Sequence, residues 1–167
     1  MRAAQRGDAR AVEALFTAYW PMCHRAAWLI TRDEAAAEDI AQESFLAAIA
    51  ALDRFDRSRR LGPWLRTIVA RRAIDAARAR AARREVDATA AQAIPASEAR
   101  NPLTGEDLGA ALGTLSYDRR AVIVLRYLLD LTPSEIAEVL ELPVGTVNSR
   151  LRRALDELQA MVEPRHG

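Results

Sequence analysis

The chain has 167 residues, 50% apolar and only 5% aromatic, which is enough for one medium domain or two small ones. Its single cysteine, Cys23, excludes an intramolecular disulfide and favours a reducing, cytoplasmic setting. Apolar runs such as residues 121–125 are too short to cross a membrane, so membrane insertion is not expected.

The formal net charge of +1 hides blocks of opposite sign. Residues 33–53 carry six acids and no arginine, residues 54–84 carry eleven arginines against two acids, and residues 85–107 carry five acids against one arginine. All 24 cationic residues are arginine, whose guanidinium suits contacts with phosphates and base edges. The blocks predict separate contact surfaces, with nucleic acid as the natural partner of the basic one.

The first 52 residues contain two apolar stripes of helical period. The first stripe comprises Val12, Leu15, Phe16 and Tyr19. Pro21 is expected to kink this helix, or to break it before a second stretch through Ile30. Thr31 or Asp33 can cap the next helix. Its apolar face comprises Ile40, Ala41, Phe45, Ala48, Ile49 and Leu52.

The opposite face of that second helix is polar and acidic, and comprises Glu38, Asp39, Gln42 and Glu43. An acidic face would repel DNA. It is therefore either a plain solvated surface or a docking site for a basic protein partner.

The basic block predicts a nucleic-acid surface. Residues 54–62 lack a stripe and are expected to form a loop, and Pro63 fits the first position of a helix that runs to about Arg84. Aromatic side chains among arginines can stack on unpaired bases while the arginines follow phosphates. The candidates are Phe55, Arg57, Arg59, Arg60, Trp64, Arg71 and Arg72. A solvated basic face with buried aromatics is the alternative, and for Trp64 alone we favour core packing.

Helical periodicity fails across residues 85–105, where scattered prolines and glycine predict a linker, and it resumes at Leu108, Leu112 and Leu115. We therefore expect an all-α fold of two small helical domains, residues 1–84 and 107–167. A flexible acidic linker at residues 85–106 would join them.

Residues 132–151 fit a helix-turn-helix. Thr132 can cap a helix with Pro133 in its first position, and Glu135 completes a capping box. The expected core residues are Ile136, Leu140, Leu142, Val147 and Leu151. In the major groove, arginine pairs with guanine and asparagine with adenine. The outward-facing candidates on the second helix are Thr146, Asn148, Ser149, Arg150, Arg152 and Arg153. An ordinary helical hairpin with a solvated polar face is the alternative.

An enzyme is not expected from this sequence. Cys23 and His24 are adjacent on a predicted helix and point to different faces, which makes a poor nucleophile–base pair. Together with His166 they do not complete a tetrahedral zinc site, and there is no glycine-rich phosphate loop. No catalytic residue, metal or cofactor is predicted.

Three segments together resemble extracytoplasmic-function (ECF) sigma factors of bacterial RNA polymerase. Residues 38–46 resemble the polymerase-binding helix, residues 62–76 the promoter-melting and minus-ten-reading helix, and residues 143–151 the minus-thirty-five reader. They occur in the family's order and at its spacing across nearly the whole chain. The resemblance implies a transcription initiation factor. The alternatives are a free-standing two-domain DNA-binding regulator and an interaction adaptor that has lost DNA binding.

The resemblance also implies partners. The β′ clamp helices of core RNA polymerase would bind the acidic face and its neighbour, that is, Glu38, Asp39, Gln42, Glu43 and Leu46. Residues 55–84 would hold the melted non-template strand and a flipped base. The linker would thread through polymerase channels, and the second domain would sit on the β-flap and read the minus-thirty-five duplex. An anti-sigma factor is implied as a further partner.

Some positions depart from the family pattern. Glu141 stands where the turn usually carries glycine, and Asn148 stands where lysine is common. Arg57, Arg59 and Arg60 make the loop before the tryptophan more basic than usual. If the turn needs a positive φ at residue 141, a side chain is strained there.

Overall fold

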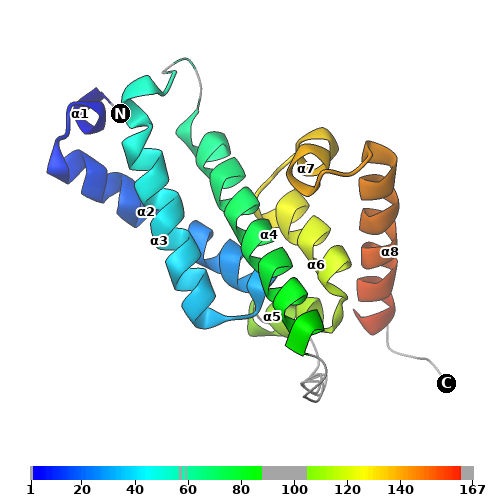
Figure 1. The fold of residues 1–167 in the computed structure, drawn as a ribbon. Coiled ribbons are helices and arrows are strands. Elements are labelled where there is room, and N and C mark those ends of the chain that lie inside the picture. Colours follow the sequence, from blue (N-terminus) through cyan, green and yellow to red (C-terminus); the bar gives the residue numbers. More distant parts are fainter. Residues whose placement is uncertain (1, 57, 59, 88–104, 163–167) are drawn as a thin grey trace.

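The structure, a computed structural model, describes residues 2–56, 58, 60–87 and 105–162, and these ranges are almost entirely helical, without a strand (Figure 1). The first domain consists of α1 (Arg2–Gln5), α2 (Ala9–Thr31), α3 (Glu34–Ala50), the 3₁₀ turn η1 (Leu52–Arg54) and α4 (Leu61–Asp87). The second consists of α5 (Gly105–Thr114), α6 (Tyr117–Ile123), the π-helical turn η2 (Val124–Leu128), α7 (Pro133–Leu140) and α8 (Val144–Val162). The expected all-α fold of two helical domains is confirmed. No helix in the described ranges is long and apolar enough to cross a membrane.

Of the two effects expected at Pro21, a kink or a break, the break is excluded, because α2 continues through this residue to Thr31. A proline in a helix interior costs about 3 kcal/mol, so packing must offset it. The helix packs against α3 and α4, and its buried residues Cys23, Ala26, Ala27, Leu29 and Ile30 follow the proline directly. Tertiary packing therefore keeps the helix intact.

The start of α4 also differs from expectation, since the helix begins at Leu61 and Pro63 is its third residue. The proline still lies in the first turn, where backbone N–H groups have no partner within the helix. Gly62 brings this turn close to α2, because a Cβ atom there would lie 3.4 Å from the ring of Tyr19.

Local capping sets the other boundaries. Asp33 caps α3 and accepts a hydrogen bond from the Ala36 N–H at 3.1 Å, whereas the Thr31 hydroxyl donates back to the Ala27 carbonyl at 2.8 Å. Of the two expected caps, the aspartate is therefore the one used. Its carboxylate also pairs with Arg80 of α4, which ties the two helices together.

The expected linker is shorter at both ends. Residues 85–87 belong to α4, and Gly105 and Glu106 belong to α5. Residues 88–104, which hold the rest of the expected linker, lie outside the described residues.

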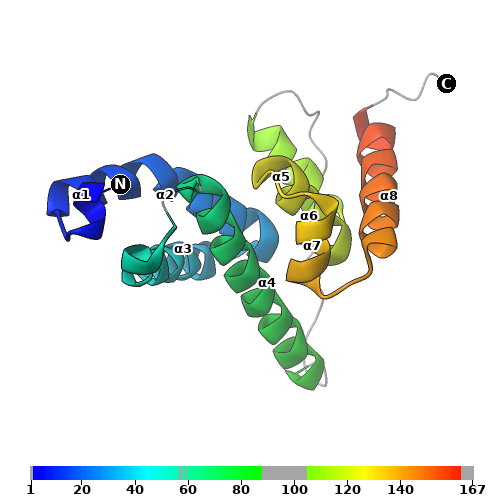
Figure 2. The same cartoon turned by 90° about the horizontal axis from the view of Figure 1, so that it is seen from above.

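The two groups of helices pack against each other instead of standing apart. α4 contacts α7, and α2 contacts α5, α6 and η2 (Figure 2). One apolar core extends through both, from Ile30 and Ile74 in the first domain to Leu125, Leu129 and Ile136 in the second. The two domains are therefore also joined by direct packing, which the expectation did not include.

Candidate protein and nucleic-acid interfaces

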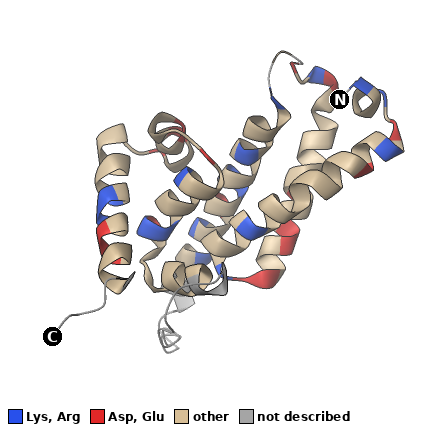
Figure 3. Ribbon diagram, turned by 180° about the vertical axis from the view of Figure 1, so that it is seen from behind, with Lys and Arg blue, Asp and Glu red and all other residues tan. Residues whose placement is uncertain are grey.

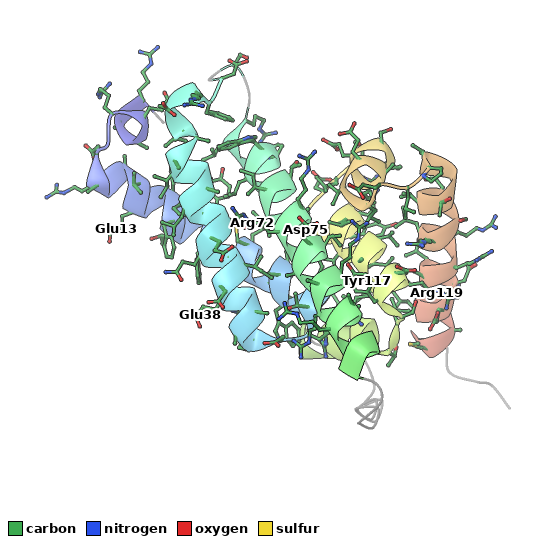
Figure 4. The ribbon with its side chains drawn as sticks, in the orientation of Figure 1. Glu13, Glu38, Arg72, Asp75, Tyr117 and Arg119 are labelled. Atoms are coloured by element: carbon green, nitrogen blue, oxygen red, sulfur yellow. The ribbon has the colours of Figure 1, made fainter. Side chains whose placement is uncertain are left out.

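The polar face predicted on α3 is solvent-exposed. Glu38, Asp39, Gln42 and Glu43 are all exposed, while Ile40, Ala41, Phe45 and Ala48 of the same helix are buried. Figure 3 shows the acidic residues on α3 and the arginines spaced along α4. In Figure 4, the Glu38 side chain projects outward from α3.

An apolar groove lies beside this acidic face, between α3 and the first half of α2. Phe16, which is 38% exposed, packs edge-on against Phe45 with ring centroids 5.0 Å apart. Leu46 is 59% exposed and lines the same groove together with Gln42. The acidic face thus has an apolar margin, and the exposure of Phe16 could not be predicted from a stripe that treats its members as equally buried.

An ion pair links the acidic face to the basic helix. The Arg72 guanidinium on α4 lies 2.8 Å from the Glu43 carboxylate on α3. Arg71, the neighbouring residue, is exposed, and so is Arg60 just before α4. The arginines expected at positions 57 and 59 lie outside the described residues.

The two aromatic candidates beside these arginines pack against each other. The Phe55 and Trp64 rings have centroids 4.8 Å apart. Phe55 is only 8% exposed and forms a small second core with Ala4 and Leu52. Phe55 is therefore largely covered in this structure, and its role in stacking on a base stays a prediction. Trp64 is partly buried, in line with the core packing expected for it.

The Gln5 side chain holds the segment from Leu52 to Phe55 in place. Its amide donates hydrogen bonds to the Leu52 carbonyl at 2.9 Å and the Phe55 carbonyl at 3.2 Å. Helical periodicity does not predict this role, because the hydrogen bonds join residues that are 47 and 50 positions apart.

The helix-turn-helix is confirmed in its local details. The Glu135 N–H donates to the Thr132 hydroxyl at 3.3 Å, and the Glu135 carboxylate accepts from the Thr132 N–H at 2.7 Å. The hydrogen bonds that this carboxylate accepts from the Thr132 N–H and from the Thr132 hydroxyl lower the pKa of the Glu135 carboxyl. Of the expected core, Ile136, Leu140, Val147 and Leu151 are buried and Leu142 is half-buried. Glu141 ends α7 with φ 56° and ψ 46°, so the turn does need a left-handed residue.

The candidate reading residues on α8 differ in how free they are. Asn148, Arg152 and Arg153 are exposed, whereas the remaining candidates Thr146, Ser149 and Arg150 are half-buried. The Ser149 hydroxyl donates to the Thr146 carbonyl at 2.9 Å. The Arg150 guanidinium lies 3.1 Å from the Asp118 carboxylate of α6. The side chains of Asn148, Arg152 and Arg153 are thus open to solvent, while Arg150 is already paired within the fold.

The cysteine and its neighbouring histidine do not form a reactive pair. Cys23 is fully buried, and burial raises the pKa of its thiol to about 12. His24 lies 3.2 Å from the Glu34 carboxylate. Within the described ranges, no three acidic, histidine or cysteine side chains gather closely enough to hold a metal ion.

Comparison with known families matches both halves of the chain. Residues 15–83 match the family described as sigma-70 region 2, and residues 105–158 match the family described as sigma-70, region 4. The ECF RNA polymerase sigma-E factor of Salmonella typhimurium (strain LT2) is 32% identical over 176 residues, which cover 96% of this chain and 91% of that protein. ECF RNA polymerase sigma factor SigC of Mycobacterium tuberculosis is 32% identical over 164 residues, which cover 96% and 88%.

Two solved structures resemble the fold over almost the whole chain. CnrH, solved in complex with the cytosolic domain of CnrY, is 30% identical with a TM-score of 0.62, and the match covers 96% of this chain and 93% of CnrH. RpoE from Bartonella quintana, solved in complex with the anti-sigma factor NepR, has a TM-score of 0.68 over 95% of this chain and all of that one. Its sequence identity of 24% makes it a likeness of fold alone.

Proposed function

Because the chain belongs to the ECF family of RNA polymerase sigma factors and is a transcription initiation factor, we propose which of its surfaces serve each step. The acidic face of α3 binds core RNA polymerase, α4 engages the minus-ten element, and α8 reads the minus-thirty-five element. The observation that carries this assignment is that one acidic surface and two arginine-bearing surfaces lie on three separate helices. The proposed role is that of a binding factor, not of a catalyst, and its place of action is the cytoplasm.

Polymerase docking uses charge and apolar contact together. The proposed docking residues are Glu38, Asp39, Gln42, Glu43 and Leu46, all of which are exposed. Carboxylates on the rim steer a basic partner to its site and fix its orientation, while buried apolar contacts carry more of the affinity. The β′ clamp helices are the proposed partner of this face, and the β-flap is that of the second domain.

Promoter engagement divides between α4 and α8. On α4, Arg71 and Arg72 are placed to meet the phosphates of a melted strand, and the partly buried Trp64 lies about two turns earlier on the same helix. On α8, Asn148 and Arg152 are four residues apart and therefore share a face of the helix, so both can meet the same duplex, Asn148 at a base edge and Arg152 at a phosphate. Phosphate contacts position a protein on DNA, and base-edge contacts specify the sequence.

An anti-sigma factor is the third proposed partner. Support comes from CnrH, a relative at 30% identity, whose structure contains the cytosolic domain of CnrY. An apolar groove with exposed Leu108, Tyr127 and Leu155 lies where α2 meets the second domain. Exposed apolar surface of this kind is typical of protein interaction sites.

The decisive experiment is reconstitution with core RNA polymerase. The purified chain should co-purify with core enzyme and support run-off transcription from a promoter selected out of a randomised library. A free-standing regulator would instead bind duplex DNA alone and give no polymerase-dependent transcript. If the chain binds core enzyme but no library member is transcribed, the promoter-reading part of the proposal fails.

A further inference from the structure

The N-terminal helix α1 folds back onto the segment that leads into α4, and it contacts η1 (Figure 1). The chain reverses at Gly7, whose φ of 80° lies in the left-handed region that suits glycine. The turn is closed by backbone hydrogen bonds from the Gly7 N–H to the Ala4 carbonyl at 3.0 Å and from the Asp8 N–H to the Ala3 carbonyl at 3.1 Å. Asp8 then caps α2, because its carboxylate accepts from the Ala11 N–H at 3.0 Å.

The inner face of α1 makes two kinds of contact with this segment. Ala4 is 5% exposed and shares a small core with Leu52 and Phe55. Gln5 is half-buried, and its amide donates to the Leu52 carbonyl at 2.9 Å and the Phe55 carbonyl at 3.2 Å. The Leu52 carbonyl also accepts from the Phe55 N–H at 3.2 Å, so the last turn before the loop is tied within itself and to α1.

Local hydrogen bonds alone do not place the loop on the molecule. The Asp56 carboxylate accepts from the Ser58 N–H at 2.9 Å and from the Ser58 hydroxyl at 2.8 Å. These bonds shape the turn, but they join residues only two positions apart. Gln5 bonds to residues 47 and 50 positions away, and it therefore fixes where the loop starts relative to α2.

Arginine predominates in the two stretches that meet at this contact. Residues 2–10 and 53–60 contain seven arginines and three aspartates. Within the described part of the chain, five of these arginines are exposed and form no ion pair; they are Arg2, Arg6, Arg10, Arg54 and Arg60. Such cations suit the phosphates of nucleic acid. The surface around Gln5 therefore has the charge of a surface that faces DNA.

We propose that Gln5 is a positioning residue for minus-ten recognition, because it fixes the backbone at Phe55 and with it the start of the loop that meets the melted strand. The inference rests on the proposed promoter role of residues 55–84. It gives α1 a part in promoter reading, although residues 2–5 lie outside the stretch that matches sigma-70 region 2, which begins at residue 15.

Base recognition depends on a fixed backbone. A binding site must hold its contacting atoms within about 0.5 Å of their working geometry. A loop whose first residue can shift loses this accuracy, and it then discriminates less well between bases. A contact that serves stability alone acts differently, since its loss lowers the amount of folded chain and weakens all promoters alike. Base preference is therefore the readout that separates the two roles.

The test uses Gln5→Met, which keeps the length and helix propensity of the side chain but removes its N–H donors. Transcription by the full chain with core RNA polymerase is measured from two promoter libraries, one randomised across the minus-ten element and one across the minus-thirty-five element. Preference at one or two neighbouring minus-ten positions should fall about 2- to 12-fold, the range that one hydrogen bond contributes. Preference across the minus-thirty-five element should stay as in the parent.

Asp8→Ala is the matched control. It removes the cap of α2 three residues away from Gln5 and lowers stability, but the Asp8 carboxylate bonds to α2 and not to the loop. This variant should keep the base preference of the parent at every position, whatever its overall activity. An unchanged preference in Gln5→Met, or the same relaxation in both variants, would overturn the proposal.

Amide hydrogen exchange tests the hold of Gln5 without any promoter. In the free full chain, followed by NMR, the Arg54 and Phe55 amides should exchange about 2- to 12-fold faster in Gln5→Met than in the parent. In Asp8→Ala they should exchange as in the parent. Equal exchange in Gln5→Met and the parent would also overturn the proposal. If exchange responds as expected but the parent selects no minus-ten sequence, the proposed function fails and the promoter role of Gln5 fails with it, while its hold on Phe55 stands.

Discussion

Arg72 and Glu43 are bonded to each other at 2.8 Å, although we assign them to different partners, DNA and polymerase. The arginine side chain is 38% exposed and the carboxylate 64%, and an ion pair this exposed contributes at most about 1 kcal/mol. Either partner can therefore displace it. We expect a basic surface that docks on Glu43 to release Arg72 for contact with a DNA phosphate, so that the two binding events are coupled.

The first prediction tests the polymerase-binding role of α3 by charge reversal. Asp39 has no ion pair within the described part of the chain, so Asp39→Arg should weaken binding to core polymerase without disturbing α4, by roughly tenfold or more (about 1.4 kcal/mol per tenfold). Adding Glu43→Arg also sets like charges against Arg72, and the double variant should abolish binding. Fluorescence anisotropy with core enzyme measures the affinity, and circular dichroism checks the fold. Asp156→Arg is the control. Parent-like affinity in the double variant would remove α3 from the docking site.

Local signals predicted much of this fold correctly. The capping box of Thr132 and Glu135 and the buried face of α3 depend on residues three or four apart, which a sequence displays directly. The sequence could not exclude a break at Pro21, because the cost of a proline is local whereas the packing of α2 that offsets it is not. The burial of Phe55 also depends on a distant residue, since Phe55 shares a small core with Ala4.

Helical periodicity could not predict how the two domains pack against each other. The Arg32–Gly109 hydrogen bond joins residues that are 77 positions apart. An apolar stripe on a helix predicts that the stripe is buried, but not which helix packs against it. One signal was present, since Gly109 and Gly113 stand four apart within a helical pattern. Such glycines mark a close approach, although they do not identify the partner helix.

The second prediction concerns the turn of the helix-turn-helix. Glu141 has φ 56°, and its side chain is 82% exposed. Its ion pair with Arg78 therefore offsets little of the backbone strain. Glu141→Gly should therefore raise the free energy of unfolding by up to about 1 kcal/mol. Urea unfolding of the full chain followed at 222 nm measures this. Glu138→Gly, within α7 at an ordinary helical position, should instead destabilise by a similar amount. A loss of stability in Glu141→Gly would mean that the ion pair outweighs the strain.

The third prediction is a pH dependence. Hydrogen bonds from the Ala36 N–H and from Arg80 lower the pKa of the Asp33 carboxyl. A lowered pKa stabilises the folded state above the unfolded-state pKa of about 3.9, and this stabilisation is lost as the pH falls through the lower, folded-state value. Asp33→Asn keeps an oxygen that can cap α3 but removes the charge. It should flatten the pH dependence of unfolding below about pH 4, while Asp33→Ala should also lose stability at pH 7. An unchanged acid profile in Asp33→Asn would show that other carboxyls set it.

The last prediction concerns how α8 reads DNA. Asn148 and Arg152 are exposed and share a face, while Arg150 is held by Asp118 at 3.1 Å. We expect Asn148→Ala to cost roughly 1–3 kcal/mol and to relax preference at one position of the minus-thirty-five element, because a base contact is lost.

Arg152→Ala tests the other kind of contact on the same helix. If its guanidinium meets mainly phosphate, the variant should weaken all promoters alike and lower the salt slope of binding by about one unit. Arg150→Ala should leave base preference nearly intact and loosen the contact between α6 and α8 instead, since its charge is already paired within the fold. Transcription from a library randomised across the minus-thirty-five element compares the three variants with the parent. Arg150→Ala could instead relax the base preference at one promoter position while Asn148→Ala does not. In that case the Arg150–Asp118 ion pair opens on DNA, and the face of α8 that reads bases is the one that carries Arg150. If all three keep the parent's preference and activity, α8 is not the reader.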